Sequence, residues 1–236
     1  MSSAPELGWL KAAAIALLLA ATLHAAPLQA APAASAHVYL VRGVLNVFSL
    51  GMDQIAARLQ QQGITATVHN HLAWEAIADD AAAEYRSGRA NTIILVGHSS
   101  GATSLPDIVA RLDQYGVPVK LAIGLDSVFH TSLSGRVERY INFYIANGPG
   151  TRVQGTGGLR GTLENVDVET VPGVSHTSID KNAVIQQKVI AAIDAAVASG
   201  PAAAPTAHRN AVPVARKHMS DVARQPSRAK RAAAAN

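Results

Sequence analysis

The sequence predicts an α/β fold with about six mostly parallel strands and helices on both faces of the sheet. Two observations support this prediction. Short β-rich apolar runs alternate with helical segments of about 10–15 residues between residues 37 and 198. One of these runs, at residues 92–96, reads Thr-Ile-Ile-Leu-Val and is continuously apolar after its first residue. A central parallel strand that is buried on both faces has this composition.

The other elements follow from the same patterns. We expect strands at residues 38–41, 65–68, 92–96, 119–125, 140–145 and 166–171, and helices at about 50–62, 72–85, 99–115 and 179–198. Gly63 ends the first helix, and Pro106 bends or interrupts the third, because a proline cannot donate a helical hydrogen bond. The last helix carries an apolar stripe formed by Val184, Ile185, Val189, Ile190, Ile193 and Val197.

Residues 1–36 have the order of a secretory signal peptide. Lys11 precedes an uncharged run at residues 12–23, and a small-residue stretch closes with Ala34-Ser35-Ala36. The uncharged run is shorter than the roughly 20 residues of a membrane-spanning helix. We therefore predict an exported protein, periplasmic or secreted, that is cleaved after Ala36 or Ala30; an uncleaved anchor is the alternative.

Residues 199–236 consist mostly of Ala, Pro, Arg and Lys. Seven cations against Asp221 alone give this tail a charge of +6, while the whole chain carries +4, so the remainder carries −2. We expect a disordered basic tail, because it has few large apolar groups. Its cations are not interleaved with aromatic residues, so no specific nucleic-acid binding is expected. Weak contact with an anionic envelope surface is the alternative role of the tail.

The chain has no cysteine, which excludes several kinds of site in the domain at residues 37–198. This absence excludes a disulfide scaffold, a thiolate zinc site and a cysteine nucleophile. We expect neither a cofactor nor a metal. The sequence does not define an oligomeric state.

Gly97-His98-Ser99-Ser100-Gly101 directly follows the most apolar strand and opens a predicted helix. In this context G-x-S-x-G is typical of a sharp turn that exposes the serine hydroxyl above the carboxyl edge of a sheet. The glycines leave room for the tight backbone. Ser99 is therefore the candidate nucleophile. A phosphate-binding loop is disfavoured, because the Lys-Ser/Thr pair of a P-loop is missing.

To act as a nucleophile, a serine hydroxyl needs a base that removes its proton, and a carboxylate orients that base. His176 is favoured as the base, because it lies between the last strand and the last helix; His130 is the alternative. Asp126 is the candidate acid, since it closes the first strand after Ser99 and so reaches the same sheet edge. Asp180 is interpreted as a first-turn acid of the last helix, and His98 is expected to point away from the site.

The oxyanion of an acyl-transfer reaction needs backbone donors after the nucleophile and after the first strand. We expect these to be the N–H groups of Ser100 and Val44, with the Asn46 side chain as a further donor. The glycine-rich segment 155–161 resembles a dinucleotide fingerprint, but it follows no clear strand. It is interpreted as a flexible loop.

These motifs resemble the α/β-hydrolase superfamily, in the form of a small secreted lipase, esterase or thioesterase-like protein. The resemblance covers residues 37–198 and rests on HVYLVRG, TIILVGHSSG, LAIGLD and VPGVSHTSID. It implies a minimal α/β-hydrolase fold with Ser99 as nucleophile, His176 as general base and Asp126 as its partner. It likewise implies Val44 and Ser100 as oxyanion donors. Arg42 departs from the histidine that many members have before the glycine, and the first antiparallel hairpin of larger members is missing.

The expected activity is hydrolysis of a carboxylic ester through an acyl-enzyme, with a small-molecule ester or a lipid as substrate. No insertion is long enough for a large lid. Two alternatives remain. One is a thioesterase of the same fold, and the other is a non-catalytic envelope-binding protein that acts through the basic tail.

Overall fold

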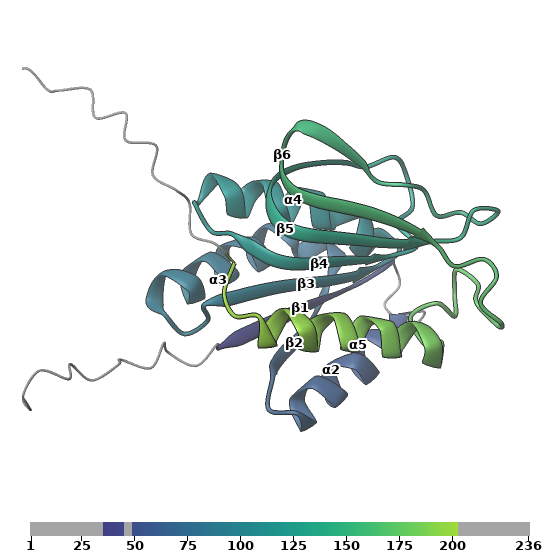
Figure 1. Ribbon diagram of the computed structural model, residues 1–236, viewed down its shortest axis with the longest axis horizontal. Coiled ribbons are helices and arrows are strands. Elements are labelled where there is room, and N and C mark those ends of the chain that lie inside the picture. The colour runs from purple at the N-terminus through teal and green to yellow at the C-terminus, as the bar shows by residue number, and fades with distance from the viewer. Residues whose placement is uncertain (1–34, 45–48, 203–236) are drawn as a thin grey trace, which may run out of the picture. The chain divides into compact units, whose positions relative to one another are not determined.

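The computed structural model describes residues 35–44 and 49–202 (Figure 1). Residues 1–34 of the expected signal peptide (1–36) and residues 203–236 of the expected tail (199–236) lie outside these ranges. In chain order the elements are β1 (Ala36–Arg42), α2 (Gly51–Gln61), β2 (Thr65–Asn70), the 3₁₀ turn η2 (His71–Ala73), α3 (Trp74–Ser87), β3 (Thr92–His98), α4 (Ser100–Gln114), β4 (Val119–Leu125), β5 (Ser132–Tyr144), β6 (Gln154–Asp167) and α5 (Ala183–Ala198).

All six strands form one sheet in the order β2-β1-β3-β4-β5-β6, and every neighbouring pair is parallel. The predicted six-stranded parallel sheet is therefore confirmed. β3 lies between β1 and β4, and all seven of its residues are buried. Because the strands are parallel, the segments that follow them begin at a common edge of the sheet, which we call the carboxyl edge.

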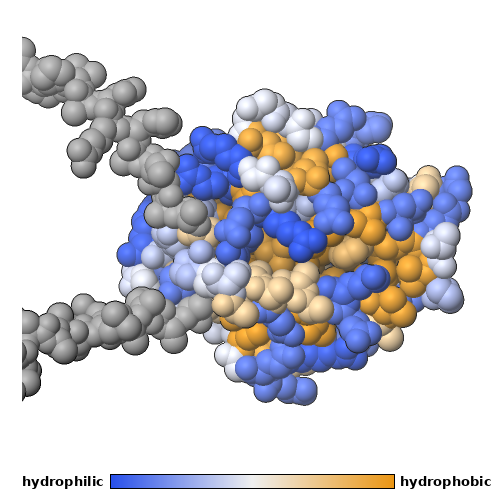
Figure 2. All heavy atoms as spheres, in the orientation of Figure 1, coloured by the Kyte–Doolittle hydropathy of each residue, from blue (hydrophilic) through white to orange (hydrophobic). Residues whose placement is uncertain are grey.

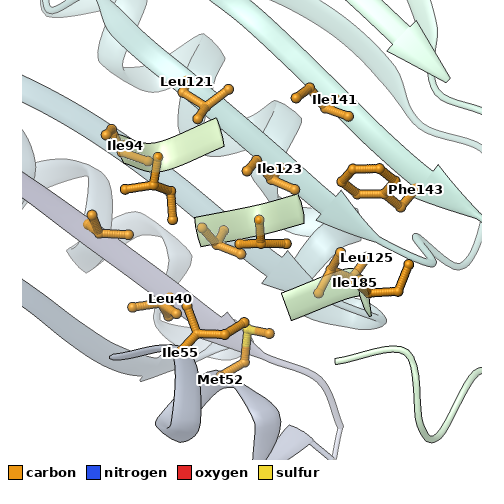
Figure 3. Packing of buried hydrophobic residues seen from close by; sticks show 14 of the residues in the cluster. Leu40, Met52, Ile55, Ile94, Leu121, Ile123, Leu125, Ile141, Phe143 and Ile185 are labelled. Carbon is orange, nitrogen blue, oxygen red and sulfur yellow. The ribbon is translucent and has the colours of Figure 1, made fainter. Parts of the chain in front are cut away.

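Helices cover both faces of the sheet, as the sequence predicts. On one face α2 and α5 pack against alternate strand residues, and Figure 3 shows Met52 and Ile55 of α2 near Leu40 and Ile185 of α5 near Leu125. On the other face α3 and α4 cover residues such as Leu95. The two apolar clusters reflect the two-residue period of the strands, which sends successive side chains to opposite faces.

β5 and β6 differ most from the prediction. Both strands curve back on themselves (Figure 1), so the short segment 145–153 joins two parallel strands without a crossover helix. The fold-back of β6 brings its beginning to its end: Val153 N–H donates to Asn165 Oδ1 at 2.9 Å. The bends fall near Gly135 and Gly161, whose φ angles of 85° and 145° favour glycine. Residues 155–161, interpreted as a flexible loop, therefore belong to β6. The strand expected at 166–171 is only the end of β6, which stops at Asp167.

Several element boundaries also differ from the expected ones. α4 runs unbroken through Pro106, and α5 begins at Ala183, after turns at residues 176–181. The carbonyl of Ser35 accepts hydrogen bonds from Asn91 N–H (2.9 Å) and Thr92 N–H (3.3 Å). The folded unit therefore includes Ser35 and Ala36, which precede the expected domain start at residue 37. Within the described ranges, no helix is both long and apolar enough to cross a membrane.

Two buried tyrosines allow the packing to be tested. The Tyr39 hydroxyl donates to Glu84 Oε2 at 3.0 Å, whereas the Tyr140 hydroxyl has no hydrogen-bond partner among the described residues. Removing a paired hydroxyl costs about 1 kcal/mol, whereas removing an unpaired buried one relieves a desolvation penalty. We expect Tyr39→Phe to lower the free energy of unfolding by about 1 kcal/mol and Tyr140→Phe to leave it unchanged or raise it, as measured by urea denaturation. A larger loss in Tyr140→Phe than in Tyr39→Phe would contradict this packing.

Candidate active site

Ser99 occupies a strained turn between β3 and α4. Its φ of 55° and ψ of −122° are unfavourable for a residue with a side chain, so the surroundings must stabilise them. A Cβ at Gly97 would lie 2.5 Å from the Gly101 carbonyl oxygen, and one at Gly101 would lie 2.2 Å from the Val41 carbonyl oxygen. Glycine is therefore required at both positions. Ser99 N–H also donates to the Leu125 carbonyl at 2.9 Å, which anchors the turn to the end of β4.

The structure brings Ser99, His176 and Asp126 into one hydrogen-bonded chain. Ser99 Oγ is 3.0 Å from His176 Nε2, and His176 Nδ1 is 2.6 Å from Asp126 Oδ2. A carboxylate only accepts, so His176 Nδ1 carries the proton that it donates to Asp126. His176 Nε2 is then free to accept the proton of the Ser99 hydroxyl. This is the arrangement in which a histidine can act as a general base.

Asp126 is held rigidly at the end of β4. Its side chain is fully buried, and its φ is 52°. Its N–H donates to the Phe143 carbonyl at 2.7 Å, and its Oδ1 accepts from Ile145 N–H at 3.0 Å. Both partners belong to the end of β5 and the residue after it. One carboxylate oxygen is thus fixed by the neighbouring strand, while the other faces His176.

His176 lies in the irregular segment between β6 and α5, and its side chain is 26% exposed. Its main-chain carbonyl accepts a hydrogen bond from His98 Nε2 at 2.8 Å. The expectation that His98 points away from the site is therefore wrong. The sequence carries one signal for this residue: a polar side chain is the last residue of a strand that is buried throughout.

The two expected oxyanion donors belong to segments that adjoin Ser99. Ser100 is the first residue of α4, so its N–H is one of the amides without a partner inside the helix. Val44 follows Gly43, and a Cβ at Gly43 would lie 2.9 Å from Ser99 Cβ and 3.3 Å from Ser99 Oγ. The chain at Gly43 therefore passes directly beside Ser99. Asn46 lies outside the described residues.

The remaining candidates lie elsewhere. His130 is exposed on the loop before β5, and it is His176 that contacts Ser99. Asp180 is fully buried and accepts a hydrogen bond from Gly51 N–H, at the start of α2, at 2.8 Å. Its interpretation as a first-turn acid of the last helix is wrong. Arg42 forms an ion pair with Asp53 of α2.

Comparisons with known proteins give the following. No protein-family model matches the sequence, and no curated protein matches it. Among solved structures, RedJ with a polyethylene glycol molecule bound in its active site is 11% identical, with a TM-score of 0.40 over 70% of this chain and 93% of that chain. A protein from Xanthomonas campestris pv. campestris, assigned to the α/β hydrolase superfamily, is 13% identical, with a TM-score of 0.37 over 69% and 96% of the two chains.

The fold itself is that of a minimal α/β hydrolase. A sharp serine turn follows the central strand of the parallel sheet, an aspartate closes the next strand, and a histidine precedes the last helix. The fold predicted from the sequence is thereby confirmed. β1 is the first strand of the sheet in chain order, and all six strands are parallel. Among the described residues, no antiparallel hairpin therefore precedes β1.

Gly150 makes the position of Asp126 testable. A Cβ at this residue would lie 1.8 Å from Asp126 Oδ1, whereas a Cβ at Gly157 of β6 would have no atom within 4 Å. We expect Gly150→Ala to displace the carboxylate and to slow covalent labelling of Ser99 by a fluorophosphonate probe by about 10- to 100-fold. Gly157→Ala is the matched control and should label at the wild-type rate. Equal labelling of the two variants would show that the contact at Gly150 does not position Asp126.

Proposed function

We propose that this protein is a serine hydrolase that cleaves carboxylic esters through a covalent acyl-enzyme. The observation that carries the proposal is the chain from Ser99 Oγ through His176 to the buried Asp126, with the serine on a strained turn. Such a chain supplies a nucleophile, a base in the correct tautomer and a charge that stabilises the protonated base.

In the first half of the proposed reaction, Ser99 Oγ attacks the ester carbonyl carbon while His176 Nε2 takes the hydroxyl proton. The carbonyl oxygen becomes an oxyanion, which the N–H groups of Ser100 and Val44 stabilise. Asp126 stabilises the imidazolium. The bond between the carbonyl carbon and the alcohol oxygen then breaks, and His176 returns the proton to the departing alcohol.

In the second half, water replaces the alcohol. His176 removes a proton from the water as its oxygen attacks the acyl carbon of the Ser99 ester. The second tetrahedral intermediate expels Ser99 Oγ, which takes the proton from His176. The products are a carboxylic acid and the regenerated serine.

Exposed apolar side chains at the carboxyl edge support a substrate with an apolar acyl group. Among the described residues, the large apolar side chains that are exposed all follow a strand or begin a helix at this edge: Val44, Leu50, Leu72, Phe129 and Val184. Orange atoms of apolar residues are visible at the right-hand end of the domain in Figure 2, where the strands of Figure 1 end. Apolar surface that gathers around a reactive group is typical of a binding site for apolar ligands.

Phe129 is the most informative of these side chains. It is 72% exposed, and its φ of 65° places an aromatic residue in a strained backbone conformation. The Thr103 hydroxyl lies within hydrogen-bond distance of the carbonyls of both Ser99 and Val128, so Phe129 adjoins a residue tied to the nucleophile turn. Exposing an aromatic ring at a strained position stabilises nothing in the free domain, so contact with a substrate is the better explanation.

Substitution of the proposed nucleophile and acid tests the reaction. Ser99→Ala should abolish hydrolysis of p-nitrophenyl acetate and labelling by a fluorophosphonate, because no other residue bonds to the carbonyl carbon. Asp126→Asn should lower kcat by about 10²- to 10⁴-fold, because the amide no longer orients and stabilises the imidazole.

Circular dichroism and the melting temperature control for folding in both variants. Turnover that persists in Ser99→Ala would reject Ser99 as the nucleophile. If the folded wild-type protein is neither labelled nor active on any ester, the enzyme proposal fails, and a non-catalytic role on a hydrolase scaffold becomes the better explanation.

A series of p-nitrophenyl esters from acetate to long acyl chains tests the apolar edge. Phe129→Ser should lower kcat/KM for the long-chain esters by about 10-fold, which corresponds to part of the free energy of burying a large apolar side chain. The acetate ester is the internal control, because its acyl group is too short to gain from this contact. A uniform loss across the series would contradict a contact between Phe129 and the acyl chain.

A further inference from the structure

His98 lies between the glycine and the nucleophile of the G-x-S-x-G motif, and it has no role in the reaction described above. Its side chain is buried, with the residue only 1% exposed. Both ring nitrogens have a partner: Nδ1 is 2.8 Å from Ser49 Oγ, and Nε2 is 2.8 Å from the main-chain carbonyl oxygen of His176. A buried histidine with two such partners is fixed in orientation.

The partners define where the protons lie. The His176 carbonyl only accepts, so His98 Nε2 carries a proton. In the neutral ring Nδ1 then accepts, and the Ser49 hydroxyl donates to it. Ser49 Oγ in turn accepts from Gly43 N–H at 3.0 Å. The result is a directed chain from Gly43 N–H through Ser49 and His98 to the carbonyl of His176.

The surroundings favour this neutral form of His98. Burial is the main cause that lowers its pKa, and the Asp180 carboxylate opposes this effect. The hydrogen bond to the His176 carbonyl also opposes it, whereas His176 and Lys181 lower the pKa further. A second proton on the ring would require Ser49 to stop donating to Nδ1, which would disturb the chain.

This chain of hydrogen bonds joins three segments whose relative positions matter for the reaction. Gly43 precedes Val44, the proposed oxyanion donor, and lies against Ser99. His98 is the neighbour of Ser99 in sequence. His176 belongs to no helix or strand; it lies in the turns between β6 and α5. Its imidazole is hydrogen-bonded to Ser99, and its main-chain carbonyl is hydrogen-bonded to His98. Two consecutive residues therefore fix both the side chain and the main chain of His176.

We propose that His98 is a positioning residue: given acyl transfer at Ser99, it fixes the main chain of His176, and through Ser49 that of Gly43, against the nucleophile. A rigid ring suits this role because it donates on one side and accepts on the other. A displacement of about 1 Å at such a site can lower a rate by 10²-fold. His98 acts on the rate through the placement of His176 and does not itself contact the substrate.

Two amide substitutions separate the two contacts of His98. In His98→Gln an amide N–H can reach the position of Nε2 and keep the bond to the His176 carbonyl. In His98→Asn the shorter side chain reaches only the position of Nδ1 and keeps the contact with Ser49. We expect kcat on p-nitrophenyl acetate to fall by about 10- to 100-fold in His98→Asn and His98→Leu, with KM little changed, and to recover largely in His98→Gln.

A readout without substrate keeps this test separate from the proposed function. In isotope-labelled protein, the His176 Nδ1 proton bonded to Asp126 gives a far-downfield proton resonance. We expect this resonance to change in His98→Asn and His98→Leu, and to stay close to wild type in His98→Gln. If the wild-type protein hydrolyses no ester, the proposed function fails, while the resonance still reports whether His98 positions His176.

Ser49→Ala tests the other end of the chain. If Ser49 and His98 act as one unit, the double variant Ser49→Ala/His98→Leu should lose no more activity than the worse single variant. Melting temperatures identify variants that are merely destabilised. The proposal is overturned if folded His98→Leu keeps the wild-type kcat and His176 resonance, or if His98→Gln falls as far as His98→Leu.

Discussion

The close approach of the turn after β3 to the backbone of β1 is the constraint on which the site depends. Gly101 lies so close to the Val41 carbonyl that even one added carbon would overlap it. This contact, together with the bond from Ser99 N–H to Leu125, holds the serine in a conformation that costs on the order of 1–3 kcal/mol. The neighbouring strands β1 and β4 thus stabilise the strained conformation in which the Ser99 hydroxyl points out of the sheet.

Strain is concentrated at the carboxyl edge. The described residues other than glycine that have a positive φ are Ser99, Asp126 and Phe129, and each follows a central strand of the sheet. The other positive φ angles among the described residues belong to glycines, such as Gly135 and Gly161 at the bends of β5 and β6. The sheet is therefore a rigid support, and the segments at its edge carry the unfavourable geometry. Parallel strands make this possible, because they bring residues that are 50 and 77 positions from His176 to one edge.

The sequence predicts the central features well, because each leaves a local signal. The apolar run of β3, the glycines around Ser99 and the aspartate after β4 identify the turn and its partners. The bends of β5 and β6 leave a weak signal, since glycines such as Gly161 are equally typical of loops. The contacts of Asp180 with α2 and of His98 with His176 join distant segments. No local pattern encodes them, so only the folded chain reveals them.

The curvature of β6 also affects how copies of this protein meet. β6 is the edge strand of the sheet and is largely exposed, and a straight exposed edge invites pairing with a strand of another molecule. Gly161 bends this edge, and Arg160 and Glu164 place charges along it, paired with Asp113 and Arg139. The fold-back that replaces a crossover helix thus also leaves no straight strand at this edge for a second molecule to pair with.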